Sequence, residues 1–451
     1  MQKTPTLLMI LDGCGTGVDS GAWTADLPRL DRLRREFAST VLSAAGPDAG
    51  LPPGVRGNRE AGYLQLGAGR IVTQPLLWVE NALADGSFYQ NPRLLYAMEQ
   101  CREAGTALHL PGLLSDDGFH AHTDCLFALL RMAKDQGLKR VYVHAFTDGS
   151  TGGKLDEVSQ YCQNLGVGTV ATVMDHRFAM DEREQWDLVE AAYDTLIYGE
   201  ASAGPAGPVL LDPEGAISDH DSVIFWNLRP ASVRELAAAL ADPLFSRFTR
   251  QIFPLHCVSM TACGVPGVQA AFGPPPVPER TLGAYLGQLG LTQLRLAAAE
   301  QYPLATTFFN GWAPEPYEGE ERIEVLPEAP GFSGHVKALR NVCLSCMESG
   351  SYDLMVLGFP SVPLEGGRLD PAGLETLDAC LGVIAEETLQ MGGIAMITSC
   401  CGGTEDQVPF LLCGAGSHLR PGRLADVAPT LLDVMGLACP EEMDGRTLIV
   451  E

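Results

Sequence analysis

Short, continuous apolar runs alternate along the chain with stretches of helical periodicity. Runs of this kind are typical of strands buried on both faces of a parallel sheet. The alternation therefore predicts layered α/β structure with mostly parallel sheets. We expect strands at residues 6–11, 108–113, 141–146, 169–173, 222–228, 306–310, 354–357, 394–398 and 408–412, and helices at 124–135, 185–196, 231–241, 371–390 and 424–435.

Two stretches indicate domain boundaries. A glycine-rich run ends at Arg70 and is followed by Thr73-Gln-Pro. The second stretch, from Gly273 onward, reads Gly-Pro-Pro-Pro-Val-Pro, and a proline-rich segment of this kind acts as a semi-rigid hinge. With 451 residues the chain is long enough for two or three domains.

Composition excludes several classes of protein. The chain has 30 basic and 56 acidic residues and a formal net charge of −26, so we expect neither nucleic-acid nor anionic-membrane binding. The 13 cysteines are scattered, as buried thiols are, and do not form a disulfide pattern. No apolar run is long enough for a signal peptide or a membrane span. We therefore expect a reduced, cytoplasmic protein.

The stretch from Gly50 to Arg70 carries the most specific chemical signal. It resembles the nucleophile region of the cofactor-independent phosphoglycerate mutases of the alkaline phosphatase superfamily, whose pattern is G-L-P-x-G-x-x-G-N-S-E-x-G-H-x-x-x-G-A-G-R. The stretches 113–122, 141–149, 179–186, 225–230, 308–311 and 422–431 have family counterparts in the same order. The resemblance covers nearly the whole chain.

The resemblance implies two α/β domains. An alkaline-phosphatase-like, metal-bearing domain would be built from residues 1–74 and 281–451. A phosphotransferase-like α/β domain would be inserted between them at residues 75–272, with residues 273–280 as the hinge. The implied activity is the interconversion of 3- and 2-phosphoglycerate, an isomerase reaction of glycolysis.

The chain departs from the family at the nucleophile. The family's mechanism needs a serine that attacks phosphorus, activated by two manganese ions. Arg59 stands at that position. A guanidinium group stays protonated and has no lone pair to offer, so it cannot attack phosphorus. Tyr63 replaces a family histidine nearby.

The metal ligands that the resemblance implies are also mostly replaced. Asp12 matches a family ligand, whereas Cys400 and Cys401 stand at the positions of a ligand aspartate and histidine. Pro363 and Gly367 occupy two further ligand positions, with Glu365 between them, and the loop that carries the last ligand histidine is missing before Val408. Manganese prefers carboxylate and imidazole to thiolate, so we expect no manganese cofactor.

The residues that contact or shape the substrate pocket in the family are retained only in part. The matching residues are His120, His122, Asp148 and Arg229. Residues that differ from the family's charged groups are Ser150, Thr151, His176, Gln185, Ser232 and Gln301, with Arg177 and Arg183 close to two of them. Fewer bidentate donors should weaken the binding of phosphoglycerate.

More than one local interpretation stays open for each unusual group. Arg59 either pairs with Asp12, which needs a counter-charge once it has no metal, or extends into solvent. Cys400 and Cys401 are either buried thiols, a redox pair or, with Asp12 and Cys14, part of a soft-metal site. Adjacent residues on an extended segment point to opposite faces, which favours the buried thiols. Cys343 and Cys346 are best explained as part of the core face of a helix.

Three functional hypotheses follow. The first is a pseudoenzyme that keeps the scaffold without the mutase reaction and binds an anionic small molecule or a protein partner, acting as a monomer. The second is an enzyme that uses the same cleft for other chemistry on a phosphorylated metabolite. The third is a working metal-dependent mutase, which would require a different alignment of the ligand segments.

Overall fold

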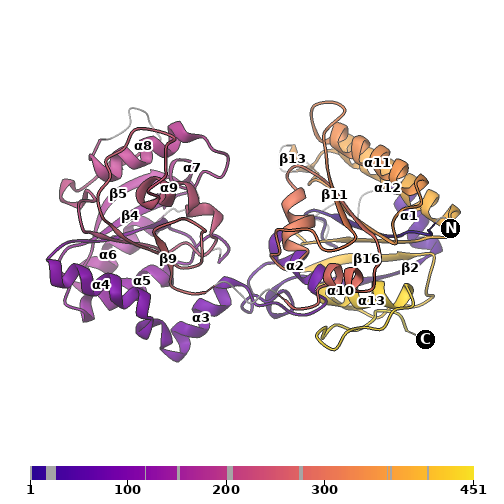
Figure 1. Ribbon diagram of the computed structural model, residues 1–451, viewed down its shortest axis with the longest axis horizontal. Coiled ribbons are helices and arrows are strands. Elements are labelled where there is room, and N and C mark those ends of the chain that lie inside the picture. The colour runs from indigo at the N-terminus through magenta and orange to yellow at the C-terminus, as the bar shows by residue number, and fades with distance from the viewer. Residues whose placement is uncertain are drawn as a thin grey trace. The chain divides into compact units, whose positions relative to one another are not determined.

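The structure is a computed structural model that describes residues 3–16, 27–116, 118–149, 153–200, 207–273, 278–362, 364–365, 368–403 and 406–450. The chain divides into two compact units, Met1–Gln74 with Pro276–Glu451, and Pro75–Pro275 (Figure 1). Residues 274–277 of the segment expected as a hinge, together with Ser150, Thr151, Pro363 and Gly367, lie outside the described residues.

The first unit is built on a mixed sheet in the order β11-β10-β12-β1-β15-β16-β2-β17. The strands from β11 to β15 run parallel, and β16 is antiparallel to β15 and β2. The strands of this sheet are β1 (Thr6–Leu11), β2 (Ala38–Ser43), β10 (Gln293–Ala298), β11 (Glu320–Val325), β12 (Leu354–Gly358), β15 (Ile394–Ser399), β16 (Gln407–Cys413) and β17 (Gly422–Arg423). The unit also contains a separate short hairpin of β13 (Leu364–Glu365) and β14 (Arg368–Leu369).

Helices cover both faces of this sheet, as Figure 1 shows. One face packs against α1 (Pro28–Glu36), α11 (Phe332–Glu348) and α12 (Pro371–Gln390). The other packs against α2 (Arg59–Ala68), α10 (Leu282–Gln288) and α13 (Val427–Val434), with the short turns η1 (Gly46–Ala49) and η5 (Leu424–Asp426). Because both faces are covered, all six residues of β1 are buried, as its unbroken apolar run predicts.

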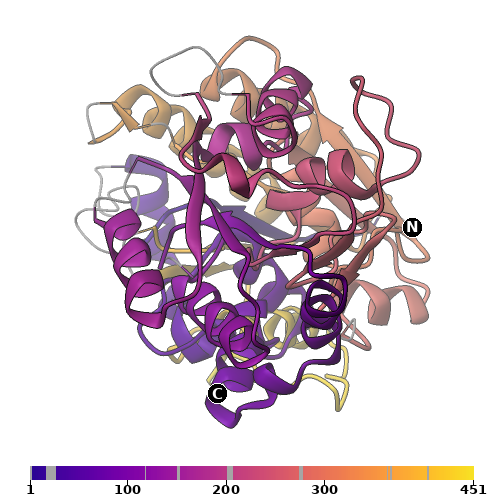
Figure 2. The same cartoon turned by 90° about the vertical axis from the view of Figure 1, so that its left-hand side faces the viewer.

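The second unit holds a sheet in the order β6-β5-β4-β3-β7-β8-β9, parallel except at β6. Helices α7, α8 and α9 lie over one face and α4, α5 and α6 under the other (Figures 1 and 2). The elements are α3 (Pro75–Asp85), η2 (Ser87–Gln90), α4 (Pro92–Ala104), β3 (Leu108–Leu113), α5 (Thr123–Asp135), β4 (Val141–Thr147), α6 (Lys154–Leu165), β5 (Thr169–Asp175), α7 (His176–Ala179), α8 (Trp186–Ile197), β6 (Val209–Leu210), η3 (Pro213–Gly215), β7 (Ser222–Phe225), α9 (Ala231–Ala241), β8 (His256–Ser259) and β9 (Val268–Ala270).

Three predicted elements differ from the structure. The strand expected at residues 306–310 is wrong: residues 306–308 belong to η4 (Leu304–Phe308), a π-helical turn, and residues 309–310 form the turn that follows it. Within η4, Thr306 Oγ1 donates to the Tyr302 carbonyl at 2.6 Å. A short buried apolar run does not distinguish strand from helix. The strand expected at 222–228 ends at Phe225, and the helix expected at 424–435 is divided into η5 and α13.

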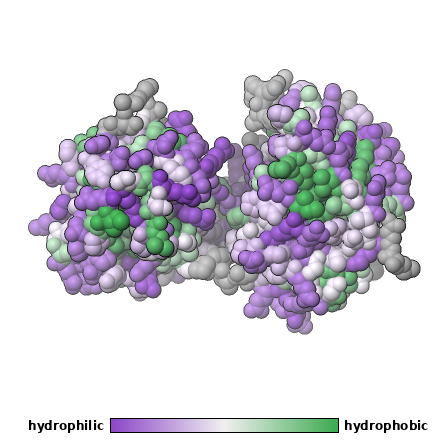
Figure 3. All heavy atoms as spheres, turned by 45° about the horizontal axis from the view of Figure 1, so that its top comes forward, coloured by the Kyte–Doolittle hydropathy of each residue, from purple (hydrophilic) through white to green (hydrophobic). Residues whose placement is uncertain are grey.

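The surface of each unit is mostly hydrophilic on the face drawn in Figure 3, with smaller hydrophobic patches between the polar side chains. All 13 cysteines lie in the described part of the chain and are free. Cys343 lies in α11 and is fully buried, which agrees with its interpretation as a core position. Within the described ranges, no helix is both long and apolar enough to cross a membrane.

Candidate functional site at the carboxyl edge of the first sheet

Three neighbouring parallel strands bring polar side chains together at one edge of the first sheet. β1 lies between β12 and β15 and runs parallel to both. Asp12 follows β1 directly, Ser361 lies three residues beyond the end of β12, and Cys400 and Cys401 follow β15. Since the carboxyl ends of parallel strands share an edge, these residues meet where ligand sites form in open α/β sheets.

Helix α2 adds Arg59 to this edge. Asn58 caps the helix by accepting from the Ala61 amide at 2.8 Å, so Arg59 is its first residue. A β-carbon at Gly62 would stand only 1.8 Å from the Cys400 carbonyl oxygen, so glycine allows the helix to pack directly on the backbone of the thiol segment. This close approach fixes the start of α2 beside Asp12.

One oxygen of Asp12 is held by three donors. Arg59 Nε lies 2.8 Å from Asp12 Oδ2, Ser361 Oγ donates to the same oxygen at 2.6 Å, and Gln301 Nε2 at 3.4 Å. Arg59 Nη2 also donates to Ser361 Oγ at 2.8 Å. The Asp12 side chain is 1% exposed and that of Arg59 46%, so a guanidinium that reaches solvent neutralises a buried carboxylate. The expected ion pair is confirmed, and the alternative of an arginine directed only into solvent is wrong.

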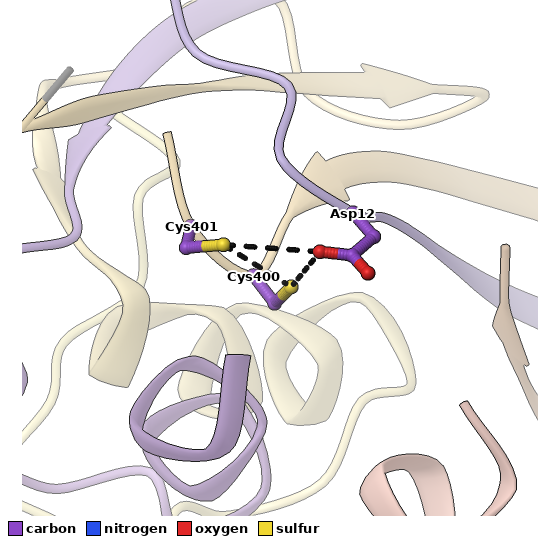
Figure 4. A group of neighbouring side chains, drawn as sticks. All are labelled: Asp12, Cys400 and Cys401. Atoms are coloured by element: carbon purple, nitrogen blue, oxygen red, sulfur yellow. Dashed lines mark hydrogen bonds between the residues drawn. The ribbon is translucent and has the colours of Figure 1, made fainter. Parts of the chain in front are cut away.

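The other oxygen of Asp12 faces two thiols (Figure 4). Asp12 Oδ1 lies 3.8 Å from Cys400 Sγ and 3.9 Å from Cys401 Sγ, and the two sulfur atoms lie 3.9 Å apart. We call Asp12, Cys400 and Cys401 the carboxylate–thiol cluster. All three residues are buried.

The expectation that the two cysteines point to opposite faces is therefore wrong. Alternation holds only within a strand, and β15 ends at Ser399. The Ser399 hydroxyl lies 3.0 Å from the Leu11 carbonyl and 2.8 Å from the Cys401 carbonyl, which turns the chain after the strand. That turn directs both sulfur atoms toward Asp12.

The two thiols differ in acidity. Burial, together with the hydrogen bond that Cys400 donates to Cys401, raises the pKa of Cys400 well above its usual value. The same hydrogen bond lowers the pKa of Cys401 against the effect of burial, helped by backbone hydrogen bonds from Gly13 and Gly403. Burial and the nearby charge of Asp12 raise the pKa of Cys14 to about 12. Cys401 is therefore the thiol that ionises first.

Two buried polar atoms beside the cluster have no hydrogen-bond partner among the described residues. They are the Tyr63 hydroxyl and Gln301 Oε1, and both residues are fully buried. Gln301 reaches the cluster through its Nε2 contact with Asp12. Burial and then the neighbouring Cys400 raise the pKa of Tyr63, which keeps its hydroxyl protonated. A buried polar atom without a hydrogen-bond partner is unfavourable. Two such atoms at one place indicate a site where a ligand or water would supply the missing partner.

The expected substrate residues lie in the second unit. His120 accepts the Leu228 amide at 2.8 Å through its carbonyl, and the neighbouring Arg229 forms an ion pair with Glu182. His122 caps α5 by accepting from the Asp124 amide, and Asp148 follows β4 and is exposed. The structure thus brings His120 and Arg229 together, while His122 has a helix-capping role.

Arg177, one of the two arginines close to the positions where the resemblance implies phosphate-binding arginines, is already paired with a carboxylate. Arg177 binds Asp175, at 2.9 Å from Nε to Oδ1, and its side chain is 61% exposed. Ser232, at the position of a family arginine, is fully buried and accepts from Asn227 Nδ2 at 3.0 Å.

The donor set of the first unit does not fit two manganese ions. Among the described residues, the groups that could hold a metal there are one carboxylate and two thiols. Manganese(II) prefers oxygen and imidazole ligands, and two such ions need more of them than one carboxylate supplies. The expected replacements Pro363 and Gly367, and the side chain of Glu365, lie outside the described part of the chain.

Sequence reasoning missed Ser361 as a member of this site. The signal was present, because Ser361 follows a buried strand next to the strand that Asp12 follows. A polar residue just beyond the end of a parallel strand is a candidate for the same edge. Ser361 now lies between the carboxylate and the guanidinium and bonds to both.

Comparisons with known proteins cover both units. A family model described as the BPG-independent PGAM N-terminus (iPGM_N) matches residues 79–263. A 2,3-bisphosphoglycerate-independent phosphoglycerate mutase from Clostridium tetani is 35% identical over 516 aligned positions, which cover 100% of this chain and 99% of the relative. Its namesake from Clostridium botulinum (strain Langeland) is 36% identical over 514 positions, with 100% of both chains covered.

A solved structure shares the whole fold. The phosphoglycerate mutase of Leishmania mexicana, crystallised at low cobalt concentration, superposes with a TM-score of 0.87 at 23% identity, covering 100% of this chain and 98% of the other. The fold is therefore that of two α/β domains, as expected from the sequence. The identity to the bacterial relatives over their full length establishes that this chain belongs to the 2,3-bisphosphoglycerate-independent phosphoglycerate mutase family.

Proposed function

We propose that this protein is a pseudoenzyme that retains the family fold and has lost the mutase reaction. The observation that carries the proposal is the ion pair of Arg59 with Asp12, 2.8 Å from Nε to Oδ2. It places a permanent cation at the position where the family resemblance implies a nucleophilic serine.

Arg59 interferes with the reaction in two ways. Its guanidinium has no lone pair with which to attack phosphorus. Its charge also occupies the Asp12 oxygen that it binds and repels a divalent ion from that side of the carboxylate. The same substitution therefore removes the nucleophile and opposes the metal that would activate one.

The remaining site supports the same conclusion. Two thiols stand beside Asp12 where the resemblance implies an aspartate and a histidine, and Gln301 stands where it implies a lysine. Each bacterial alignment is longer than this chain, so the relatives contain segments that this chain lacks. The chain therefore differs from the family pattern at the nucleophile, at the metal ligands and in segments that are absent.

The second unit supports a binding role for the protein. Arg229 and His120 retain family positions, and the guanidinium of Arg229 lies 5.4 Å from the centre of the Phe119 ring. This guanidinium is paired with Glu182, and a carboxylate or phosphate group of a ligand would replace that carboxylate as its partner. We propose an anionic small molecule as the ligand, which a thermal-shift screen of phosphorylated metabolites would detect as a rise in Tm.

A coupled assay for conversion of 3- to 2-phosphoglycerate tests the loss of activity. The protein, its Arg59→Ser variant and the Clostridium tetani relative are assayed in parallel, each with manganese, cobalt or zinc. We expect the unaltered protein to stay at least about 10⁴-fold below the relative, because loss of a catalytic nucleophile alone has effects of that size. We expect Arg59→Ser to stay low as well, because the described residues around the restored serine do not supply the set of oxygen and imidazole ligands that would hold two activating metal ions.

Each outcome of the assay has a distinct meaning. Turnover by the unaltered protein within about 100-fold of the relative would contradict the proposal, since rates of that order need a working nucleophile. Turnover only by Arg59→Ser would show that the metal site still functions and that the nucleophile alone was lost. Arg59→Lys is the matched control, because it keeps the charge without restoring a hydroxyl.

A further inference from the structure

The three ligand atoms of the carboxylate–thiol cluster form a nearly equilateral triangle. Its sides are 3.8, 3.9 and 3.9 Å, between Asp12 Oδ1, Cys400 Sγ and Cys401 Sγ. In a tetrahedral site with Zn–S of about 2.3 Å and Zn–O of about 2.0 Å, neighbouring ligand atoms stand about 3.5–3.8 Å apart. We propose that these three residues bind a single zinc ion.

The donor types select zinc over manganese. The two thiolates are soft donors that suit zinc better than manganese, and a carboxylate is also an accepted zinc ligand. The geometry is also closed, because Cys400 is fully buried and Asp12 and Cys401 are 3% and 6% exposed. A closed thiolate site indicates a structural ion rather than an ion with an open position for a substrate.

Arg59 completes the charge balance of such a site. Two thiolates and one carboxylate carry three negative charges, and one zinc ion leaves a single negative charge. The guanidinium bound to Asp12 neutralises that charge. With two divalent ions the same residues would hold an excess of positive charge at a buried position, which is strongly unfavourable.

The two carboxylate oxygens of Asp12 have different neighbours. Oδ2 receives Arg59, Ser361 and Gln301, whereas Oδ1 faces the two sulfur atoms. Hydrogen bonds to a ligating carboxylate orient it and strengthen its metal binding. Oδ1 is therefore held in place on the side where the zinc ion would be bound.

The unpartnered polar atoms provide an independent indication of a ligand. Tyr63 and Gln301 are fully buried, and the Tyr63 hydroxyl and Gln301 Oε1 have no partner in the described part of the chain. Buried polar oxygens are otherwise satisfied by protein or by ordered water. One of these oxygens, or a water bound between them, would supply the fourth ligand of a tetrahedral ion.

Metal analysis tests the proposal on the full-length protein. The protein is reduced, incubated with zinc sulfate, passed over a desalting column and analysed by inductively coupled plasma mass spectrometry. We expect one zinc ion per chain, and loss of at least about 90% of it in Cys400→Ser and in Cys401→Ser, because thiolates supply most of the affinity. Cys413→Ser is the matched control, since Cys413 is a buried cysteine of the same unit on β16.

Cobalt substitution keeps the test decisive if a variant fails to fold. Cobalt(II) added to the unaltered protein should produce a near-ultraviolet sulfur-to-cobalt charge-transfer band and the visible bands of a tetrahedral ion. Zinc content below about one-tenth of an equivalent, with no such band, would overturn the proposal, and so would full zinc retention in the folded Cys400→Ser variant. Cys346→Ser distinguishes this site from binding at Cys343 and Cys346 on α11.

The metal analysis and the mutase assay test the zinc proposal and the pseudoenzyme proposal independently. Zinc bound by a protein without turnover supports both proposals. Absence of zinc leaves the pseudoenzyme proposal unaffected, because that proposal rests on Arg59.

Discussion

Each of the two compact units contains a buried polar cluster, and the two clusters differ in how completely their atoms are paired. The first is the carboxylate–thiol cluster of Asp12, Cys400 and Cys401. The second, which we call the histidine chain, crosses the sheet of the second unit and consists of Asp221, His109, His144 and Thr172. In both clusters the side chains lie almost entirely out of contact with water.

Every ring nitrogen of the histidine chain has a partner. His109 Nε2 lies 3.1 Å from Asp221 Oδ2, His109 Nδ1 lies 2.9 Å from His144 Nε2, and His144 Nδ1 lies 2.9 Å from Thr172 Oγ1. Because an ionised aspartate only accepts, His109 Nε2 donates to it, His144 Nε2 donates to His109, and the Thr172 hydroxyl donates to His144. The chain is complete with both histidines neutral.

The carboxylate–thiol cluster shows the opposite pattern. Asp12 Oδ2 has three donors, Oδ1 faces two weak thiol donors, and two oxygens close by have no partner among the described residues. A fully paired buried network fixes a structure, whereas an incompletely paired one is unfavourable unless something binds to it. This difference leads us to interpret the histidine chain as structural and the carboxylate–thiol cluster as a binding site.

The largest expected effect is on stability, through the histidine chain. His144→Ala removes the ring that joins His109 to Thr172 and leaves a cavity. It also leaves His109 Nδ1 and Thr172 Oγ1 buried without their hydrogen-bond partner. We expect the free energy of unfolding to fall by about 3–5 kcal/mol, and Tm by about 10 °C in differential scanning calorimetry. His176→Ala, in the same unit at a half-exposed position, should change Tm far less. Equal effects would show that the histidine chain is not an important structural element.

The pH dependence of stability should be the next largest effect. Burial lowers the pKa of His109 and lowers that of His144 well below its usual value of 6.5. The unfolded chain therefore takes up protons that the folded protein does not, so the free energy of unfolding falls as pH drops below about 6.5. Each histidine contributes at most about 1.4 kcal/mol per pH unit.

Urea unfolding at several pH values between 7.5 and 5.5 measures this effect as a difference between the protein and His144→Gln. We expect the variant to lose less stability on acidification than the unaltered protein. Burial raises the pKa of Glu235 to about 7, which acts in the opposite direction between about 4.5 and 7 but equally in both forms. A variant that is more acid-sensitive than the unaltered protein would contradict the neutral histidine chain.

The smallest expected effect concerns Ser361, which bonds to both Asp12 and Arg59. Ser361→Ala should lower the free energy of unfolding by about 1 kcal/mol without zinc, because one hydrogen bond to a charged group is lost. The affinity for zinc should fall by about 10-fold, as for other groups that orient a metal ligand. Isothermal titration with zinc measures the change, with Ser417→Ala as the exposed control. Unchanged affinity would show that Ser361 does not orient Asp12.

The sequence predicted those parts of the molecule that depend on local pattern or simple charge pairing. The buried strand at residues 6–11 follows from its apolar run, and the contact of Arg59 with Asp12 follows from the need of a buried carboxylate for a counter-charge. The apolar run at 306–310 is equally compatible with a buried helix, so its prediction as a strand was wrong.

The geometry of the thiols could not be predicted from the sequence. Whether Cys400 and Cys401 share a face depends on where β15 ends, and the hydrogen bonds of Ser399 to Leu11 and Cys401 determine the turn that follows. Leu11 belongs to a strand almost 400 residues away in the chain, paired side by side with β15. Only the folded sheet brings these atoms together.

A crystal structure grown with excess manganese chloride, with anomalous diffraction data, tests the central claim most directly. Our account predicts that Arg59 Nε stays within hydrogen-bond distance of Asp12 Oδ2, at about 2.8 Å, and that no manganese peak appears beside Asp12. Two manganese peaks bound to Asp12, with the Arg59 side chain displaced into solvent, would contradict the account.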